Sequence, residues 1–104
     1  MRKIKVIIKE PGKKPRSVRI SDTEKNLQRT VGGYVDMITI ATDLKVLCNE
    51  GGRRDGLPWC CNICGVDFVG TVVFVGLDKG EFTDVPCTYD EVKRLFPRLW
   101  EDVE

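Results

Sequence analysis

Val69-Gly70-Thr71-Val72-Val73-Phe74-Val75 is the most apolar segment of this chain of 104 residues. A short apolar run bounded by glycine, with Gly76 directly after it, is typical of a strand that is buried on both faces. We therefore expect residues 69–75 to form the central strand of a β-sheet. The hydrophobic core should lie against this strand, with shorter strands and helices around it.

Two hairpins are predicted ahead of the central strand. Residues 3–9 and residues 17–20 alternate polar with apolar residues in part, and prolines and glycine between them mark a turn, so residues 1–20 should form a hairpin with a basic tip. Residues 34–40 and residues 44–48 flank a tight turn at Asp43 and predict a second hairpin. Each hairpin should add its strands to the sheet.

Two helices are predicted from their capping residues. Ser21 or Asp22 can cap a helix over residues 22–31, with a capping-box glutamate three residues after Ser21, and two glycines would end it. Thr88 begins a second capping box, Thr-Tyr-Asp-Glu, at the start of a C-terminal helix and acidic tail over residues 88–104. Pro97 should kink or shorten that second helix.

These elements predict an α+β fold, with a mixed or antiparallel sheet of about five strands and two helices, the second covering one face. A chain of 104 residues with 41% hydrophobic and 32% charged residues fits one folded domain, residues 1–104. The core of so small a domain is thin, so association with another copy would add stability, and we expect a homo-oligomer.

Composition also predicts where the protein works. The N-terminus lacks the apolar region of a signal peptide, and no run approaches the roughly 18 apolar residues of a membrane span. The five cysteines are an odd number and cluster, which argues against a secreted disulfide framework. We therefore expect a soluble, cytoplasmic protein with reduced thiols and no membrane partner.

Charge is distributed unevenly along the chain. Residues 1–19 hold eight Lys or Arg and one acid, a net charge of +7, whereas residues 20–104 have a net charge of −6. The basic hairpin can attract phosphates, but lysines on the solvent side of a strand also discourage edge pairing, and we favour that second interpretation. Long nucleic acid is an unfavourable partner because the acidic remainder repels its backbone.

Six short phrases together carry a resemblance to a known family. They are Glu10-Pro11-Gly12-Lys13-Lys14-Pro15, Leu27-Gln28 with Val31-Gly32-Gly33-Tyr34, Cys48-Asn49-Glu50, Gly56-Leu57-Pro58, Asn62, and Gly70-Thr71-Val72-Val73-Phe74-Val75-Gly76. In these phrases, residues 4–77 resemble the small-protein family catalogued as domain of unknown function 3846, which is widespread in bacteriophages and mobile elements of bacteria. The resemblance implies a small α+β domain of phage or mobile-element origin, without established catalytic residues.

The loop over residues 49–65 gathers three of the five cysteines. Cys61-x-x-Cys64 is half of a zinc site that Cys48 and Cys87 could complete. Zinc signatures normally show two close pairs, and the resemblance does not extend to these cysteines, so we favour their packing as small buried hydrophobic residues. Pro58 should begin a short helical turn through Asn62, and Gly65 breaks the helix that a thioredoxin-type redox pair would need.

The chain contains no histidine, nucleophile elbow, phosphate loop or paired-carboxylate motif, so we expect a protein that is not an enzyme. The same loop is better suited to binding. Arg53 and Arg54 can bind phosphate, Asn49 and Asn62 can pair with base edges or hold the loop, and Trp59 or Tyr34 can stack on a ring.

We therefore expect a non-enzymatic phage or mobile-element protein that binds and sequesters a small anionic nucleotide signal of host immunity. Two alternatives stay open: a small zinc-binding domain, and a protein-interaction inhibitor of a host enzyme. The loop could also be a solvated hairpin tip with Trp59 in the core. The inhibitor would use acidic residues near the C-terminus, which are Asp90, Glu91, Glu101, Asp102 and Glu104.

Overall fold

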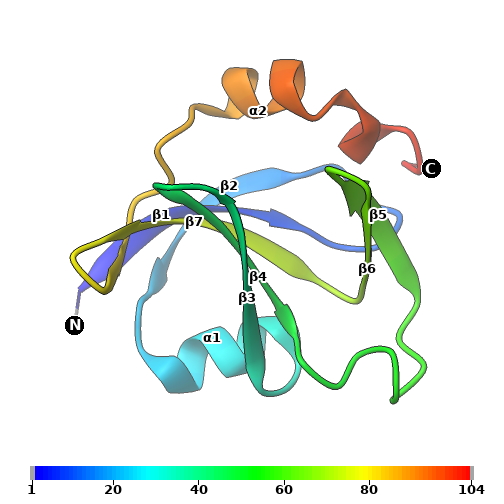
Figure 1. Ribbon diagram of the computed structural model, residues 1–104, viewed down its shortest axis with the longest axis horizontal. Coiled ribbons are helices and arrows are strands. Elements are labelled where there is room, and N and C mark those ends of the chain that lie inside the picture. The colour runs from blue at the N-terminus through cyan, green and yellow to red at the C-terminus, as the bar shows by residue number, and fades with distance from the viewer. Residues whose placement is uncertain (1, 104) are drawn as a thin grey trace.

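The predicted central strand lies in the middle of a six-stranded sheet in the computed structural model, which describes residues 2–103 (Figure 1). Neighbouring strands of this sheet are antiparallel, in the order β2-β1-β7-β4-β3, and β8 pairs with β7. The α+β prediction is confirmed, and this sheet has one more strand than expected. The strands are β1 (Lys3–Lys9), β2 (Arg16–Ser21), β3 (Val35–Ala41), β4 (Leu44–Asn49), β7 (Val72–Asp78) and β8 (Glu81–Thr83).

Both predicted hairpins are present, as β1–β2 and β3–β4. Arg16 and Arg19 are exposed on the edge strand β2, in agreement with a solvated basic edge. Lys9 differs from this expectation, because β1 lies between β2 and β7 and the side chain of Lys9 is fully buried. Lys9 Nζ instead donates to Asp102 near the C-terminus at 2.8 Å. Glu104, the last acid of the predicted tail, lies outside the described residues.

Two helices cover opposite faces of the sheet, α1 (Glu24–Val31) and α2 (Tyr89–Leu95), and a 3₁₀-helix, η1 (Pro97–Trp100), follows α2. The predicted N-caps of α1, Ser21 or Asp22, were wrong: its N-cap is Thr23, whose hydroxyl accepts from Asn26 N at 3.3 Å. The predicted glycine end is confirmed, with Gly32 as the C-cap. The capping box of α2 is confirmed, and Pro97 ends the α-helix as predicted.

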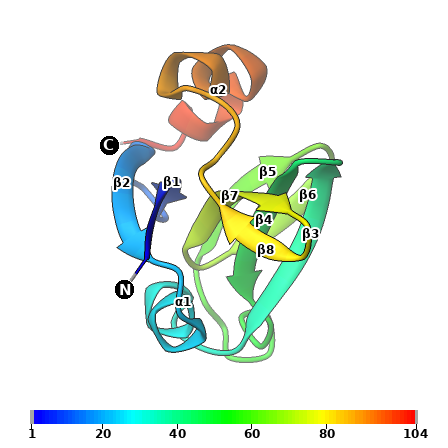
Figure 2. The ribbon, with the colours of Figure 1, turned by 90° about the vertical axis from the view of Figure 1, so that its left-hand side faces the viewer.

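Side chains of β7 alternate between two hydrophobic cores. Val73 and Val75 pack with α1 on one face, and Val72 and Phe74 pack on the other face beneath α2 and η1. Figure 2 shows α2 and α1 at opposite ends of the molecule with the sheet between them. No helix of residues 2–103 has the length and apolar character needed to cross a membrane.

The segment before the central strand differs from the prediction. The helical turn expected at residues 58–62 is instead a strand, β5 (Trp59–Ile63), which pairs with β6 (Val66–Val69) in a separate two-stranded sheet. Val69 therefore belongs to β6, and Gly70, with a φ of 72°, turns the chain into β7. The β5–β6 hairpin covers the β4 end of the sheet on the α2 face, beside η1 (Figure 1).

Candidate functional site

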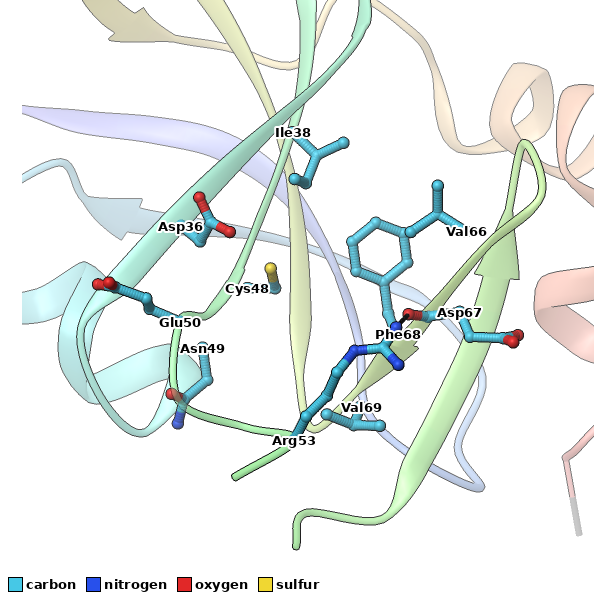
Figure 3. A pocket seen from close by; sticks show the side chains of 10 residues that line it. All are labelled: Asp36, Ile38, Cys48, Asn49, Glu50, Arg53, Val66, Asp67, Phe68 and Val69. Carbon is cyan, nitrogen blue, oxygen red and sulfur yellow. Dashed lines mark hydrogen bonds between the residues drawn. The ribbon is translucent and has the colours of Figure 1, made fainter. Parts of the chain in front are cut away.

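A cavity of about 130 Å³ opens between the β3–β4 edge of the sheet and strand β6. Its lining includes apolar side chains, three acidic residues and one arginine. Figure 3 shows that the carboxylate of Asp67 points away from the cavity, whereas its main-chain carbonyl faces Arg53. The cavity therefore offers hydrogen-bond acceptors, one cationic donor and a hydrophobic surface within a small volume. The lining residues are Asp36, Ile38, Cys48, Asn49, Glu50, Arg53, Val66, Asp67, Phe68 and Val69.

The turn after β4 places Arg53 at the rim. Asn49 Oδ1 accepts from Gly51 N at 2.8 Å, and the Asn49 carbonyl accepts from Gly52 N at 3.2 Å. A Cβ at Gly33 would lie within 3 Å of both the Oδ1 and the Nδ2 of Asn49, so a side chain at position 33 would clash with the Asn49 amide. Asn49 thus supports the turn at the same time as it lines the cavity.

The two neighbouring arginines lie in different places. Arg53 Nη2 donates to the carbonyl oxygen of Asp67 at 2.5 Å, which holds its guanidinium across the cavity toward β6 (Figure 3). Arg54 pairs with the carboxylate of Asp55 at 3.4 Å, and its side chain is 82% exposed. Arg53 lines the cavity and Arg54 does not.

Asp67 gathers two more of the predicted ligand-binding residues. Its Oδ1 accepts from Trp59 Nε1 at 3.1 Å and from Asn62 Nδ2 at 3.0 Å. The hydrogen bond from Asn62, followed by that from Trp59, lowers the pKa of the Asp67 carboxyl below its ordinary value. Trp59 and Asn62 therefore fasten the β5–β6 hairpin, outside the cavity lining.

Trp59 is 48% exposed, so the alternative that placed it in the core was wrong. Tyr34 is 74% exposed, and it directly precedes β3, where its carbonyl accepts from Glu50 N. Of the six predicted residues, Asn49 and Arg53 line the cavity, Trp59 and Asn62 contact Asp67, and Tyr34 and Arg54 lie elsewhere on the surface.

Sequence reasoning missed three acidic residues of the lining, Asp36, Glu50 and Asp67, and its apolar side chains. Asp36 and Ile38 come from the edge strand β3, whereas Asp67 and Phe68 come from β6, which was not predicted as a strand. The available signal was the Cys64-Gly65 pair. Both residues have positive φ, 52° and 85°, as a two-residue hairpin turn requires.

The cysteines are mostly buried. Cys60 and Cys61 lie in the core, Cys48 and Cys87 are half-buried, and Cys64 is exposed. Burial, together with the charge of Asp36 and despite Arg53, raises the pKa of the Cys48 thiol to about 11, and burial raises that of Cys87. Within residues 2–103, no three His, Cys, Asp or Glu side chains group to hold a metal ion, so the proposed zinc ligands do not meet.

Several acids of the C-terminal region bind within the chain. Glu91 accepts from Thr88 N in the capping box, and Asp102 accepts from the buried Lys9. Glu101 lies 3.7 Å from Arg98 at the exposed surface. The predicted acidic surface is thus reduced by two residues that stabilise the fold.

No curated protein and no solved structure matches this chain. A family model described as Domain of unknown function (DUF3846) matches residues 4–97. The matched region includes all strands of the six-stranded sheet from residue 4 onward, the β5–β6 hairpin, both α-helices and every residue that lines the cavity. The chain belongs to this family of unknown function.

Proposed function

We propose that this chain is a non-enzymatic phage or mobile-element protein that binds and sequesters a small anionic nucleotide signal of host immunity in the host cytoplasm. The cavity between β3–β4 and β6 would receive the base, and Arg53 would bind a phosphate at its rim. The observation that carries the proposal is that the guanidinium of Arg53, at the rim of the cavity, forms no salt bridge with residues 2–103.

The positive charge of Arg53 lies at the rim of the cavity. Its guanidinium is anchored by a main-chain carbonyl, that of Asp67, and forms no salt bridge with any residue from 2 to 103. A guanidinium has five N–H donors in a planar fork that matches phosphate. The remaining donors are therefore available to an anionic ligand.

The rim carboxylates suit the other end of a nucleotide. Asp36 and Glu50 can accept hydrogen bonds from base N–H groups, and Ile38 and Phe68 offer an apolar surface to the ring. They would repel a phosphate, so phosphate binding is confined to the Arg53 side of the rim. A ligand that carries both N–H donors and an anionic group fits this distribution.

The size of the cavity agrees with a bound base. At about 130 Å³ it is smaller than the sites of about 300 to 1,000 Å³ that usually hold complete small molecules. The base would enter the cavity, and the sugar and phosphate would lie along the rim. The exposed ring of Trp59, on the neighbouring hairpin, is available to stack on a projecting part of the ligand.

The side chains of the cavity support binding without chemical change of the ligand. The chain has no histidine, and the thiol that lines the cavity, Cys48, stays protonated at neutral pH because its pKa is about 11. Binding without turnover amounts to sequestration.

Isothermal titration calorimetry with a panel of cyclic and linear nucleotides tests the proposal. We expect saturable binding of at least one nucleotide, and mass spectrometry of the recovered ligand should show it unchanged. Absence of binding across the panel would contradict the binding function, and a chemically altered ligand would contradict its non-enzymatic character.

A further inference from the structure

One edge of the six-stranded sheet, strand β3, has unpaired main-chain groups along its outer side. The bond from Glu50 N to the Tyr34 carbonyl, at 2.8 Å, identifies Tyr34 and Glu50 as a hydrogen-bonded pair. Hydrogen-bonded and non-hydrogen-bonded pairs alternate along an antiparallel ladder, so Asp36 and Ile38 also bond to β4. The main-chain N–H and C=O groups of the residues between them point outward; these residues are Val35, Met37 and Thr39.

The open part of this edge ends at Thr39. The β3–β4 register shifts between Thr39 and Ala41, which marks a bulge. Lys45 Nζ reaches across from β4 and donates to Thr39 Oγ1 at 3.2 Å and to the Ala41 carbonyl at 3.3 Å. The segment that is available for further pairing therefore runs from Val35 to Thr39, with Met37 at its centre.

Outside the bulge at its end, strand β3 lacks the basic residues and prolines that often prevent edge pairing. Strand β3 contains no Lys, Arg or Pro, whereas β2 at the opposite edge exposes Arg16 and Arg19. Met37 is 42% exposed. It also borders a groove of about 400 Å³ on the α1 face, which Leu27 and Phe82 line together with two acidic residues, Asp22 and Glu24.

We propose that a second copy of this chain docks on β3, with the two β3 strands antiparallel and related by a two-fold axis at Met37. In this register, Val35 pairs with the partner's Thr39, and Met37 pairs with the partner's Met37. Each such pair exchanges both of its main-chain hydrogen bonds, so the outward groups of the edge are satisfied.

Charge favours this self-pairing. Asp36 is the one charged residue of β3, and it would lie opposite Ile38 of the partner subunit, away from the partner's Asp36. Within the paired segment from Val35 to Thr39, no like charges face each other across the axis. The two methionine side chains would meet on the α1 face, where each covers apolar surface beside the groove.

The pairing would also extend the nucleotide cavity. Asp36 and Ile38 of β3 line this cavity, on the face of the sheet opposite Met37, so a strand added to β3 would lie beside it. The partner's strand would then continue the cavity wall, which a single chain leaves at about 130 Å³. This consequence rests on the proposed function. The association itself needs no ligand and can be measured without one.

Sedimentation equilibrium of the full chain tests the interface. The wild type should have about twice the 11.8 kDa mass of one chain. Met37→Lys and Met37→Glu should each sediment as monomers, because residue 37 would then face its own charge. An equimolar mixture of the two variants should recover the dimer mass, since a lysine would face a glutamate.

Ser17→Lys on the exposed part of β2 is the matched control, and it should remain a dimer. Circular dichroism verifies that each variant is folded. A monomeric wild type, a dimeric Met37→Lys, or a mixture that stays monomeric would overturn the proposed pairing. A dimer that binds no nucleotide would contradict the proposed function but support the interface. A monomer that binds a nucleotide would contradict the interface but support the proposed function.

Discussion

Lys9 Nζ lies 2.8 Å from Asp102 Oδ1 and 3.1 Å from Oδ2, so the end of the chain is bound to the end of its first strand. The Lys9 side chain is fully buried and also donates to the carbonyls of Glu10 and Lys13. Asp102 Oδ2 accepts a further bond from Gly12 N at 2.9 Å. This pair holds the segment after η1 against the sheet. It thereby helps to keep α2 and η1 packed over one of the two hydrophobic cores.

Asp102→Ala should lower the free energy of unfolding by about 3 kcal/mol, because it leaves the buried ammonium of Lys9 without its carboxylate. Glu101→Ala is the matched control: its carboxylate is 67% exposed, so the change should stay within about 0.5 kcal/mol. Urea denaturation measures both. Equal losses in the two variants would show that the Lys9 pair does not secure the C-terminal segment.

The same pair predicts a pH dependence. Burial alone would raise the pKa of Asp102, but the hydrogen bonds from Lys9 and Gly12 and the charge of Lys9 together lower it. A carboxyl with a lowered folded-state pKa contributes its stabilisation above the unfolded-state pKa of about 3.9, and loses it as the pH falls through the folded value. The stability difference between wild type and Asp102→Ala should therefore narrow in acid, and a difference that is constant with pH would contradict this origin.

Asp67→Ala should loosen the β5–β6 hairpin, since it removes the acceptor of both Trp59 and Asn62. In a Trp100→Phe background, where Trp59 is the remaining tryptophan, we expect lower fluorescence anisotropy for the alanine variant. Asp55→Ala, in the exposed pair with Arg54, is the control and should leave the anisotropy unchanged. An unchanged anisotropy in Asp67→Ala would show that the carboxylate does not hold the hairpin.

Thiol labelling should separate the cysteines by burial. Cys64 is exposed at the hairpin turn and should react first with a maleimide in the native protein. Cys60 and Cys61 are at most 1% exposed and should react only after unfolding, and the raised pKa of Cys48 should slow its reaction. Mass spectrometry counts the labels over time. Rapid labelling of Cys60 or Cys61 would contradict the packing of β5 in the core.

The sheet and both helices were predictable because local signals were strong. The apolar run of β7, the alternation in β1 and the capping box at Thr88 each agree with the final structure. The two-residue turns were weaker signals. Cys64 and Lys79 occupy positive φ at positions where Asn, Asp or Gly are usual, so the β5–β6 and β7–β8 turns were not recognised and strands β5, β6 and β8 were missed.

The candidate site could be predicted only in part, since its halves meet through tertiary packing. Asn49 and Arg53 were found from a loop rich in polar and flexible residues. Asp36 and Asp67, separated by 31 positions in the sequence, line one cavity because β6 folds back over the β3–β4 edge. No local pattern in either segment predicts that approach.

Calorimetry of the adjacent arginine variants, with a nucleotide that the wild type binds, tests the central claim most directly. Arg53→Ala should weaken binding by about 10-fold to 150-fold, the cost of losing a charge-assisted hydrogen bond of about 1.5 to 3 kcal/mol. Arg54→Ala should bind as the wild type does, because Arg54 lies outside the cavity. Full affinity in Arg53→Ala, or an equal loss in both variants, would contradict a phosphate site at the cavity rim.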